Sequence, residues 1–153
     1  MKTAFLMFLA TMLIATCSNA TINKFEEKLS SDIPDDKDTL VNFEYETIGK
    51  PPTGFSQTTT GVSKDMKWTV VNETQNKVVA QQAMNEGSCY NILVFDKLNY
   101  LDFTASVRIK AVSGDEDQGG GLMWRYIDNN NYYIARYNPL ENNLRFYRVV
   151  NGS

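Results

Sequence analysis

Arginine and tyrosine side chains recur between residues 108 and 137, and both types of side chain can contact a sugar. A guanidinium presents a fork of donors to hydroxyls or carboxylates, and a tyrosine ring stacks on the apolar face of a sugar. If these side chains share the open face of one sheet, they form a binding row made of Arg108, Arg125, Tyr133, Arg136 and Tyr137. The alternative is that they are ordinary cross-strand neighbours on a solvent-facing sheet, which requires no ligand.

Carboxylates are the other groups able to do chemistry, because the chain contains no histidine. This excludes Ser-His-Asp triads, Cys-His dyads and zinc sites with histidine ligands. A glycosidase needs two carboxyl groups about 5–10 Å apart across a sugar, and the candidates are Glu141, Asp128 and the acidic run 115–117. Glu141 has a structural alternative, a salt bridge to Arg136 or Arg145 across a hairpin. These carboxyl groups do not identify a catalytic pair, so the sequence favours a binding function over a catalytic one.

Composition indicates one ordinary globular domain. The chain has 153 residues, of which 42% are hydrophobic and 22% are charged, and such values are far from those of a disordered chain. The 15 basic and 18 acidic residues give a formal charge of −3, which argues against a nucleic-acid partner.

The first 20 residues have the three-part form of a secretory signal peptide. Lys2 precedes an apolar run over 4–15, and small residues follow up to Ala20, after which we expect cleavage. The run is shorter than the roughly 20 residues of a membrane span. Residues 14–17 also resemble a lipobox, so the alternative is a lipoprotein lipidated at Cys17. We therefore expect an exported protein, periplasmic or extracellular, in which Cys89 is a lone, half-buried thiol.

Three segments are expected along the chain: a signal peptide at 1–20, a polar linker at 21–40 and a β-domain at 41–153. About eight strands at 8–14-residue spacing predict an antiparallel sandwich or barrel. The expected strands are 41–48, 66–72, 76–82, 90–95, 100–112, 121–127, 131–138 and 143–150.

Individual strands carry further expectations. Strict alternation over 100–112 places six apolar residues on one face: Leu101, Phe103, Ala105, Val107, Ile109 and Ala111. The apolar run 90–95 suits a strand covered on both faces. Turns are expected at 128–130 and 139–142, and Trp68 and Trp124 are expected in the core.

Three stretches carry a resemblance to a known family: "GKPPTGF" at 49–55, "WTVVNET" at 68–74, and 103–152 with its Gly-Gly, Asp-Asn turn and Tyr-Tyr-x-x-Arg strand. They resemble the concanavalin A-like lectin/glucanase superfamily, in particular the jelly-roll domains grouped with the 3-keto-disaccharide hydrolases of exported bacterial proteins. The resemblance implies two curved antiparallel sheets packed face to face, with glycans as a common ligand class.

The resemblance carries over no catalytic residue, because the Glu-x-Asp-x-x-Glu strand signature of the retaining glucanases is absent. Members of the superfamily often hold calcium near a sandwich edge, and Asp115, Asp117 and Asp128 are the oxygen donors that would serve here. We expect no obligatory cofactor, with Ca²⁺ as the alternative.

Relatives of this kind continue beyond the last strand, so we expect a chain that is C-terminally truncated or that pairs with another copy. An unpaired strand edge invites self-association, and it leaves Leu144 and Phe146 with less cover. The leading functional hypothesis is a non-catalytic or accessory domain that binds a glycan or polysaccharide. The alternatives are a glycoside hydrolase or lyase acting through carboxylates or a metal, and a cell-surface protein-interaction domain without a sugar ligand.

Overall fold

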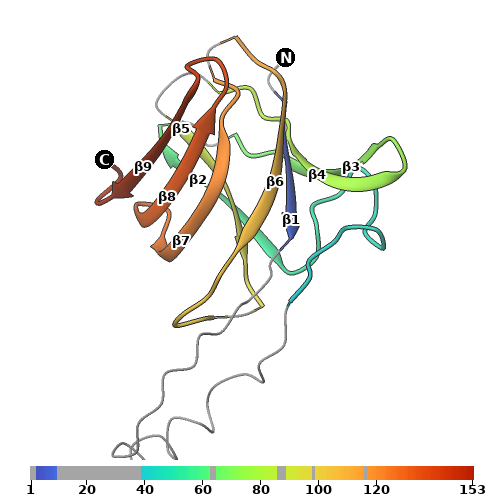
Figure 1. The fold of residues 1–153 in the computed structure, drawn as a ribbon, viewed down its shortest axis with the longest axis horizontal. Helices are drawn as coiled ribbons and strands as arrows, with labels where there is room; N and C mark the ends of the chain where they lie inside the picture. The colour runs from blue at the N-terminus through green and yellow to red at the C-terminus, as the bar shows by residue number, and fades with distance from the viewer. Residues whose placement is uncertain (1–2, 10–38, 63–64, 86–88, 98, 116) are drawn as a thin grey trace, which may run out of the picture.

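The computed structural model describes residues 3–9, 39–62, 65–85, 89–97, 99–115 and 117–153, and these contain nine strands and no helix (Figure 1). The strands are β1 Thr3–Leu9, β2 Phe55–Gly61, β3 Trp68–Glu73, β4 Asn76–Gln81, β5 Cys89–Phe95, β6 Ser106–Ser113, β7 Gly120–Asp128, β8 Asn131–Asn138 and β9 Asn143–Val149. Every strand pair is antiparallel. The all-β, antiparallel prediction is confirmed.

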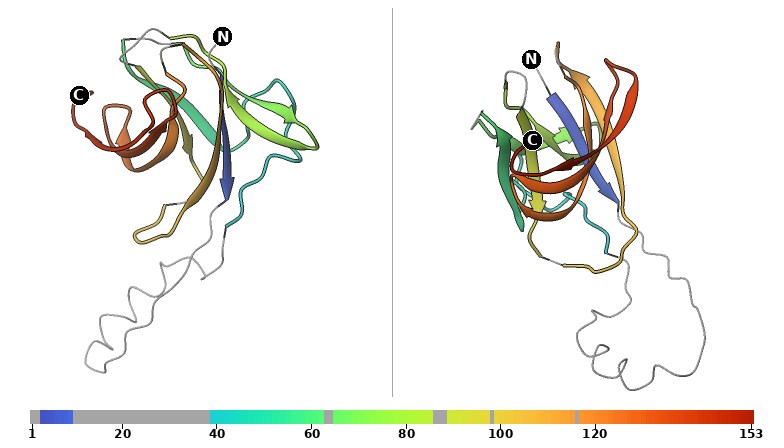
Figure 2. Two further views of the ribbon diagram at one scale, coloured as in Figure 1. Left: turned by 45° about the horizontal axis from the view of Figure 1, so that its top comes forward. Right: turned by 90° about the vertical axis from the view of Figure 1, so that its left-hand side faces the viewer.

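The strands form three small sheets, with orders β3-β4-β1-β6, β2-β5 and β7-β8-β9. The β3–β4 hairpin and the β7–β9 sheet lie on opposite sides of the molecule (Figures 1 and 2). Two continuous curved sheets are what the family resemblance implies, and the jelly roll stays a prediction.

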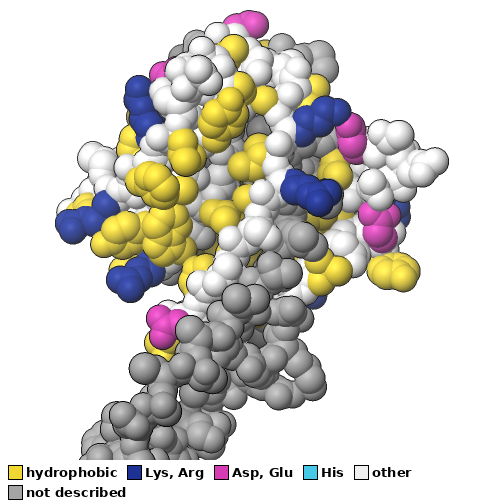
Figure 3. Space-filling model, viewed as in Figure 1, with side chains coloured by type: hydrophobic (Ala, Val, Ile, Leu, Met, Phe, Trp, Pro, Cys, Tyr) yellow, Lys and Arg dark blue, Asp and Glu magenta, His cyan; other side chains and the backbone are white. Residues whose placement is uncertain are grey.

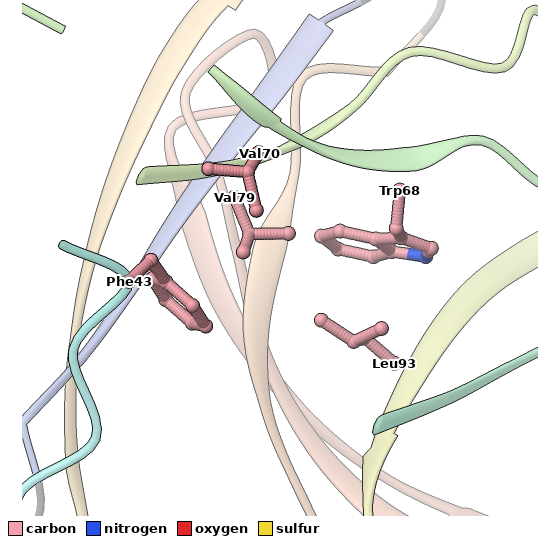
Figure 4. Close-up of a cluster of buried hydrophobic side chains, with 5 residues drawn as sticks. All are labelled: Phe43, Trp68, Val70, Val79 and Leu93. Atoms are coloured by element: carbon pink, nitrogen blue, oxygen red, sulfur yellow. The ribbon is translucent and has the colours of Figure 1, made fainter. Parts of the chain in front are cut away.

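Strand β5 contributes to two separate hydrophobic cores, because neighbouring side chains on a strand point to opposite faces. Leu93, 8% exposed, joins the cluster of Phe43, Trp68, Val70 and Val79 (Figure 4). Ile92, 5% exposed, joins Tyr132 and Val149 instead. The β2–β5 pair therefore lies between the other two sheets, and the expected covering of this strand on both faces is confirmed.

Two of the expected strands are wrong in whole or in part. Residues 41–48 form turns instead of a strand: Phe43, 2% exposed, and the partly buried Val41 pack in the core, whereas Tyr45, on the same side of the expected alternation, is 98% exposed. Strand β2, which follows this segment in the chain, is not among the strands expected from the sequence. The expected strand 100–112 begins only at Ser106, and Leu101 on its predicted inner face is 88% exposed.

Both expected hairpin turns are confirmed, and side-chain caps hold each of them. Asp128 accepts hydrogen bonds from the backbone N–H of Asn130 at 2.7 Å and from Nδ2 of Asn131 at 2.9 Å. Asn138 Oδ1 accepts the N–H of Leu140 at 3.1 Å. These caps fix the register of β7 against β8 and of β8 against β9.

The predicted signal peptide and linker lie mostly outside the described residues. Of 1–40, only Thr3–Leu9 and Thr39–Leu40 are described, so cleavage after Ala20 and lipidation at Cys17 stay predictions. Cys89 is partly buried, as expected, and its Sγ accepts a hydrogen bond from Nδ2 of Asn85 at 3.5 Å. The described part of the chain contains no helix with the length and apolar character needed to cross a bilayer.

Candidate functional site

The β7–β8–β9 sheet has one face against the core and one toward solvent, which we call the outer face. Along β8, Tyr132 and Asn138 are 2% and 1% exposed, whereas Tyr137 is 45% exposed. Register and alternation place eight residues on the outer face: Leu122, Trp124, Tyr133, Ala135, Tyr137, Leu144, Phe146 and Arg148. Figure 3 shows hydrophobic side chains gathered over these strands, with basic side chains at their margin.

Aromatic rings dominate the outer face. Trp124 stacks on Tyr133 with ring centroids 6.0 Å apart and planes 21° from parallel. Phe146 is 71% exposed and Leu144 is 59% exposed, as expected for a poorly covered last strand. Trp68 is in the core as predicted, but Trp124 is only partly buried and belongs to neither buried cluster. Its expected core position is wrong, because the strand register turns it outward.

The five predicted binding residues do not form one row. Tyr133 and Tyr137 share the outer face, but Arg136 lies between them in alternation and points to the opposite face. Arg125 is exposed in a left-handed conformation, with φ of 50°, where the β7–β8 register shifts. Arg108 is exposed on β6, in a different sheet.

Arg136 forms the centre of an ion-pair cluster. Its side chain is 11% exposed, Nη1 donates to Asp117 at 2.8 Å, and Nη2 donates to Glu141 at 3.0 Å. The guanidinium carbon lies 5.8 Å from the centroid of the Tyr147 ring. The expected structural salt bridge between Glu141 and Arg136 is therefore present, and the fork of Arg136 is occupied by protein carboxylates.

The candidate carboxyl groups are poorly suited to act as general acids, which require a raised pKa at neutral pH. A hydrogen bond from Asn143 lowers the pKa of Glu141, with smaller contributions from Arg145 and Arg136. The backbone N–H of Asn130 is the largest cause of the lowered pKa of Asp128. Both groups are held ionised in structural hydrogen bonds.

Two of the three expected calcium donors are engaged in other ways. Asp117 bonds Arg136 and Asn138, and Asp128 caps its own turn, whereas Asp115 is exposed. The described part of the chain holds no group of three or more acidic or cysteine side chains arranged for a metal ion.

Six of the eight outer-face residues are absent from the sequence-based binding candidates, and Arg148 and Phe146 are among them. Arg148 lies directly opposite Tyr133, and Phe146 lies opposite Ala135. The sheet face on which these two side chains lie could have been predicted from the sequence. A hairpin turn at 139–142 fixes which residues of β8 and β9 are paired, so the alternation of β8 continues into β9.

Lowering the pH is expected to weaken the β8–β9 hairpin. The pKa of Glu141 is depressed below its ordinary value of 4.5. Its contribution to stability is therefore complete above pH 4.5 and is lost as the pH falls through the lower, folded-state pKa. Thermal melts between pH 7 and pH 3 should show a smaller drop for Glu141→Gln than for the parent chain. Equal drops would contradict this assignment.

No family model, no curated protein and no solved structure matches this chain.

Proposed function

We propose that this protein is an exported, non-catalytic domain of the concanavalin A-like lectin type that binds a glycan on the outer face of its β7–β8–β9 sheet. The observation that carries the proposal is the solvent-facing aromatic surface around the stacked Trp124–Tyr133 pair. Flat rings present the apolar surface on which the C–H face of a sugar packs.

Charge and hydrogen-bonding groups at the edges of the outer face complete a site of this kind. Arg148 is exposed beside Tyr133, and the exposed Arg125 follows Trp124 in β7. The guanidinium groups supply donors for sugar hydroxyls or for a carboxylate on an acidic polysaccharide. Specificity for a neutral or an acidic glycan would depend on these two side chains.

Binding without catalysis is favoured by the state of the carboxylates. Asp117 and Glu141 both bond the guanidinium of Arg136. A hydrolase would need one of two carboxyl groups to be protonated at neutral pH, whereas the pKa of Glu141 is lowered.

Removing rings from the outer face is expected to weaken glycan binding without unfolding the protein. Tyr137→Ala and Phe146→Ala are each expected to weaken binding about two- to tenfold, the equivalent of roughly 0.5–1.5 kcal/mol per ring contact. A glycan array identifies the ligand, and titration of the intrinsic tryptophan fluorescence with that ligand gives the dissociation constants. Tyr45→Ala is the matched control, because Tyr45 is 98% exposed and lies on the 41–48 segment.

Each outcome of this experiment has a defined meaning. If the two outer-face variants bind like Tyr45→Ala, the proposed face is wrong. If the parent chain releases sugar from its ligand, the hydrolase or lyase alternative replaces the binding proposal. If no glycan is bound, the exposed aliphatic Leu144, 59% exposed beside Phe146, favours the third candidate, a protein-interaction surface that includes pairing at the β9 edge.

Export has its own test. Mass spectrometry of the secreted product is expected to show an N-terminus at Thr21, because small residues precede Ala20 as signal peptidases require. A mature chain starting at a lipidated Cys17 would show that the lipoprotein alternative is correct.

A further inference from the structure

Strand β1 occupies an internal position in the four-stranded sheet. Residues 3–9 pair with β6 along their whole length, and residues 4–6 also pair with β4 (Figure 1). Leu6 is paired with Val79 on one side and Ile109 on the other. Strand β1 therefore fills the gap between β4 and β6, which are not hydrogen-bonded to each other.

This gap would not close easily if β1 were removed. Because β1 is antiparallel to both neighbours, β4 and β6 are parallel to each other and about 10 Å apart, two strand spacings. Val79 of β4 is buried in the core, and Val107 and Ile109 of β6 pack against the same cluster. Bringing the two strands together would displace one of them from that cluster.

Loss of β1 would also leave two rows of backbone N–H and C=O groups without partners. Such edges recruit an additional strand, because main-chain hydrogen bonds supply affinity whatever the side chains are. One face of the gap is apolar on both sides: Val79 of β4 is 0% exposed, and Val107 and Ile109 of β6 pack against the same cluster. The alternate β6 residues Arg108 and Lys110 are exposed. An occupant therefore needs an apolar side toward the core, and the sequence of β1, TAFLMFL, is uncharged and predominantly apolar.

We propose that the gap between β4 and β6 is an acceptor site for a β-strand from a partner polypeptide, an extended apolar segment of seven residues that runs antiparallel to both strands. In the precursor, Thr3–Leu9 fills this site. The proposal rests on the proposed export, because removal of residues 1–20 would vacate the gap. The mature domain would then be completed by the strand of its partner.

The test uses the full chain with a specific protease site inserted after Ala20, so that β1 can be released without relying on a cell to process it. After cleavage and gel filtration, a fluorescent peptide of residues 2–10 with three added lysines is titrated and followed by anisotropy. We expect binding to the cleaved protein and at least tenfold weaker binding to the uncut chain, whose site is filled. The matched control is the same peptide with Leu6→Pro, which lacks the backbone N–H at the position paired on both sides.

Register provides a second readout. In a Cys17→Ser, Cys89→Ser background, a peptide carrying Phe5→Cys should form a disulfide with Lys110→Cys, its partner in the observed register. Arg108→Cys, two residues away on the same strand, is the off-register control and should react much more slowly.

The outcomes separate this proposal from the proposal of export. Selective binding of the β1 peptide, or refolding of a cleaved, unfolded protein by that peptide alone, supports the acceptor site even if cells never remove residues 1–20. Equal binding of the Leu6→Pro peptide overturns it. The proposal is also overturned if the cleaved protein stays folded and does not bind the peptide, or if it unfolds and the peptide does not refold it.

Discussion

Replacing Trp68 by alanine is expected to lower the free energy of unfolding by about 3–5 kcal/mol, the usual cost of removing a buried aromatic side chain. Trp68 is 6% exposed and belongs to the cluster that joins β3 and β4 to Leu93 of β5 (Figure 4). Because small domains have a total stability of only about 5–15 kcal/mol, this one substitution removes a large part of it. Urea denaturation followed by circular dichroism measures the change.

Trp68→Phe is the matched control for this prediction. The indole Nε1 of Trp68 is buried and has no hydrogen-bond partner among the described residues. Phenylalanine keeps most of the apolar contact and removes a donor that is left unsatisfied, which offsets part of the lost area. The phenylalanine variant should therefore lose less than half as much stability as the alanine variant. Equal losses would show that the indole N–H is satisfied and contributes to stability.

Replacing Tyr132 by alanine is expected to cost a similar 3–5 kcal/mol and to disrupt the second core. Tyr132 is 2% exposed and packs with Ile92 of β5 and Val149 of β9. Its hydroxyl lies 2.8 Å from Oγ1 of Thr60, whose own proton is donated to the backbone oxygen of Asn129. Tyr132 is therefore the donor of this pair, and burial, the largest effect, raises the pKa of its hydroxyl and keeps it protonated.

Tyr132→Phe separates the hydrogen bond from the ring. The ring and its packing are retained, so the loss should be about 0.5–1.5 kcal/mol, the net value of one hydrogen bond. Hydrogen exchange should show that Tyr132→Ala raises the exchange of β8 and β9 amides more than that of β3 and β4, because the affected core joins β5 to the β7–β9 sheet. Uniform loss of protection would instead indicate that the two cores unfold as one unit.

The sequence alone determined the class of the fold and much of its local structure. Alternation over 100–112 marked β6, although the strand begins only at Ser106. The apolar run at 90–95 marked a strand covered on both sides, where Ile92 and Leu93 join different cores. Asp128 and the asparagines after it marked the β7–β8 turn. These features are local, because side-chain period and turn chemistry act over a few residues.

The tertiary structure decided which of these elements became strands and which faces they presented. The alternating segment 41–48 has a strand-like pattern, but none of the nine described strands pairs with it, and only Val41 and Phe43 pack in the core. The sequence offered a salt bridge between Arg136 and Glu141 only as an alternative to a binding row. The packed sheets decided that Arg136 turns inward to Asp117 and Glu141 while Tyr133 and Tyr137 face outward. Strand pairing, register and burial depend on contacts between residues far apart in the chain. Composition and spacing therefore indicate which side chains are available for binding. Only the packed sheets determine which of these side chains lie together.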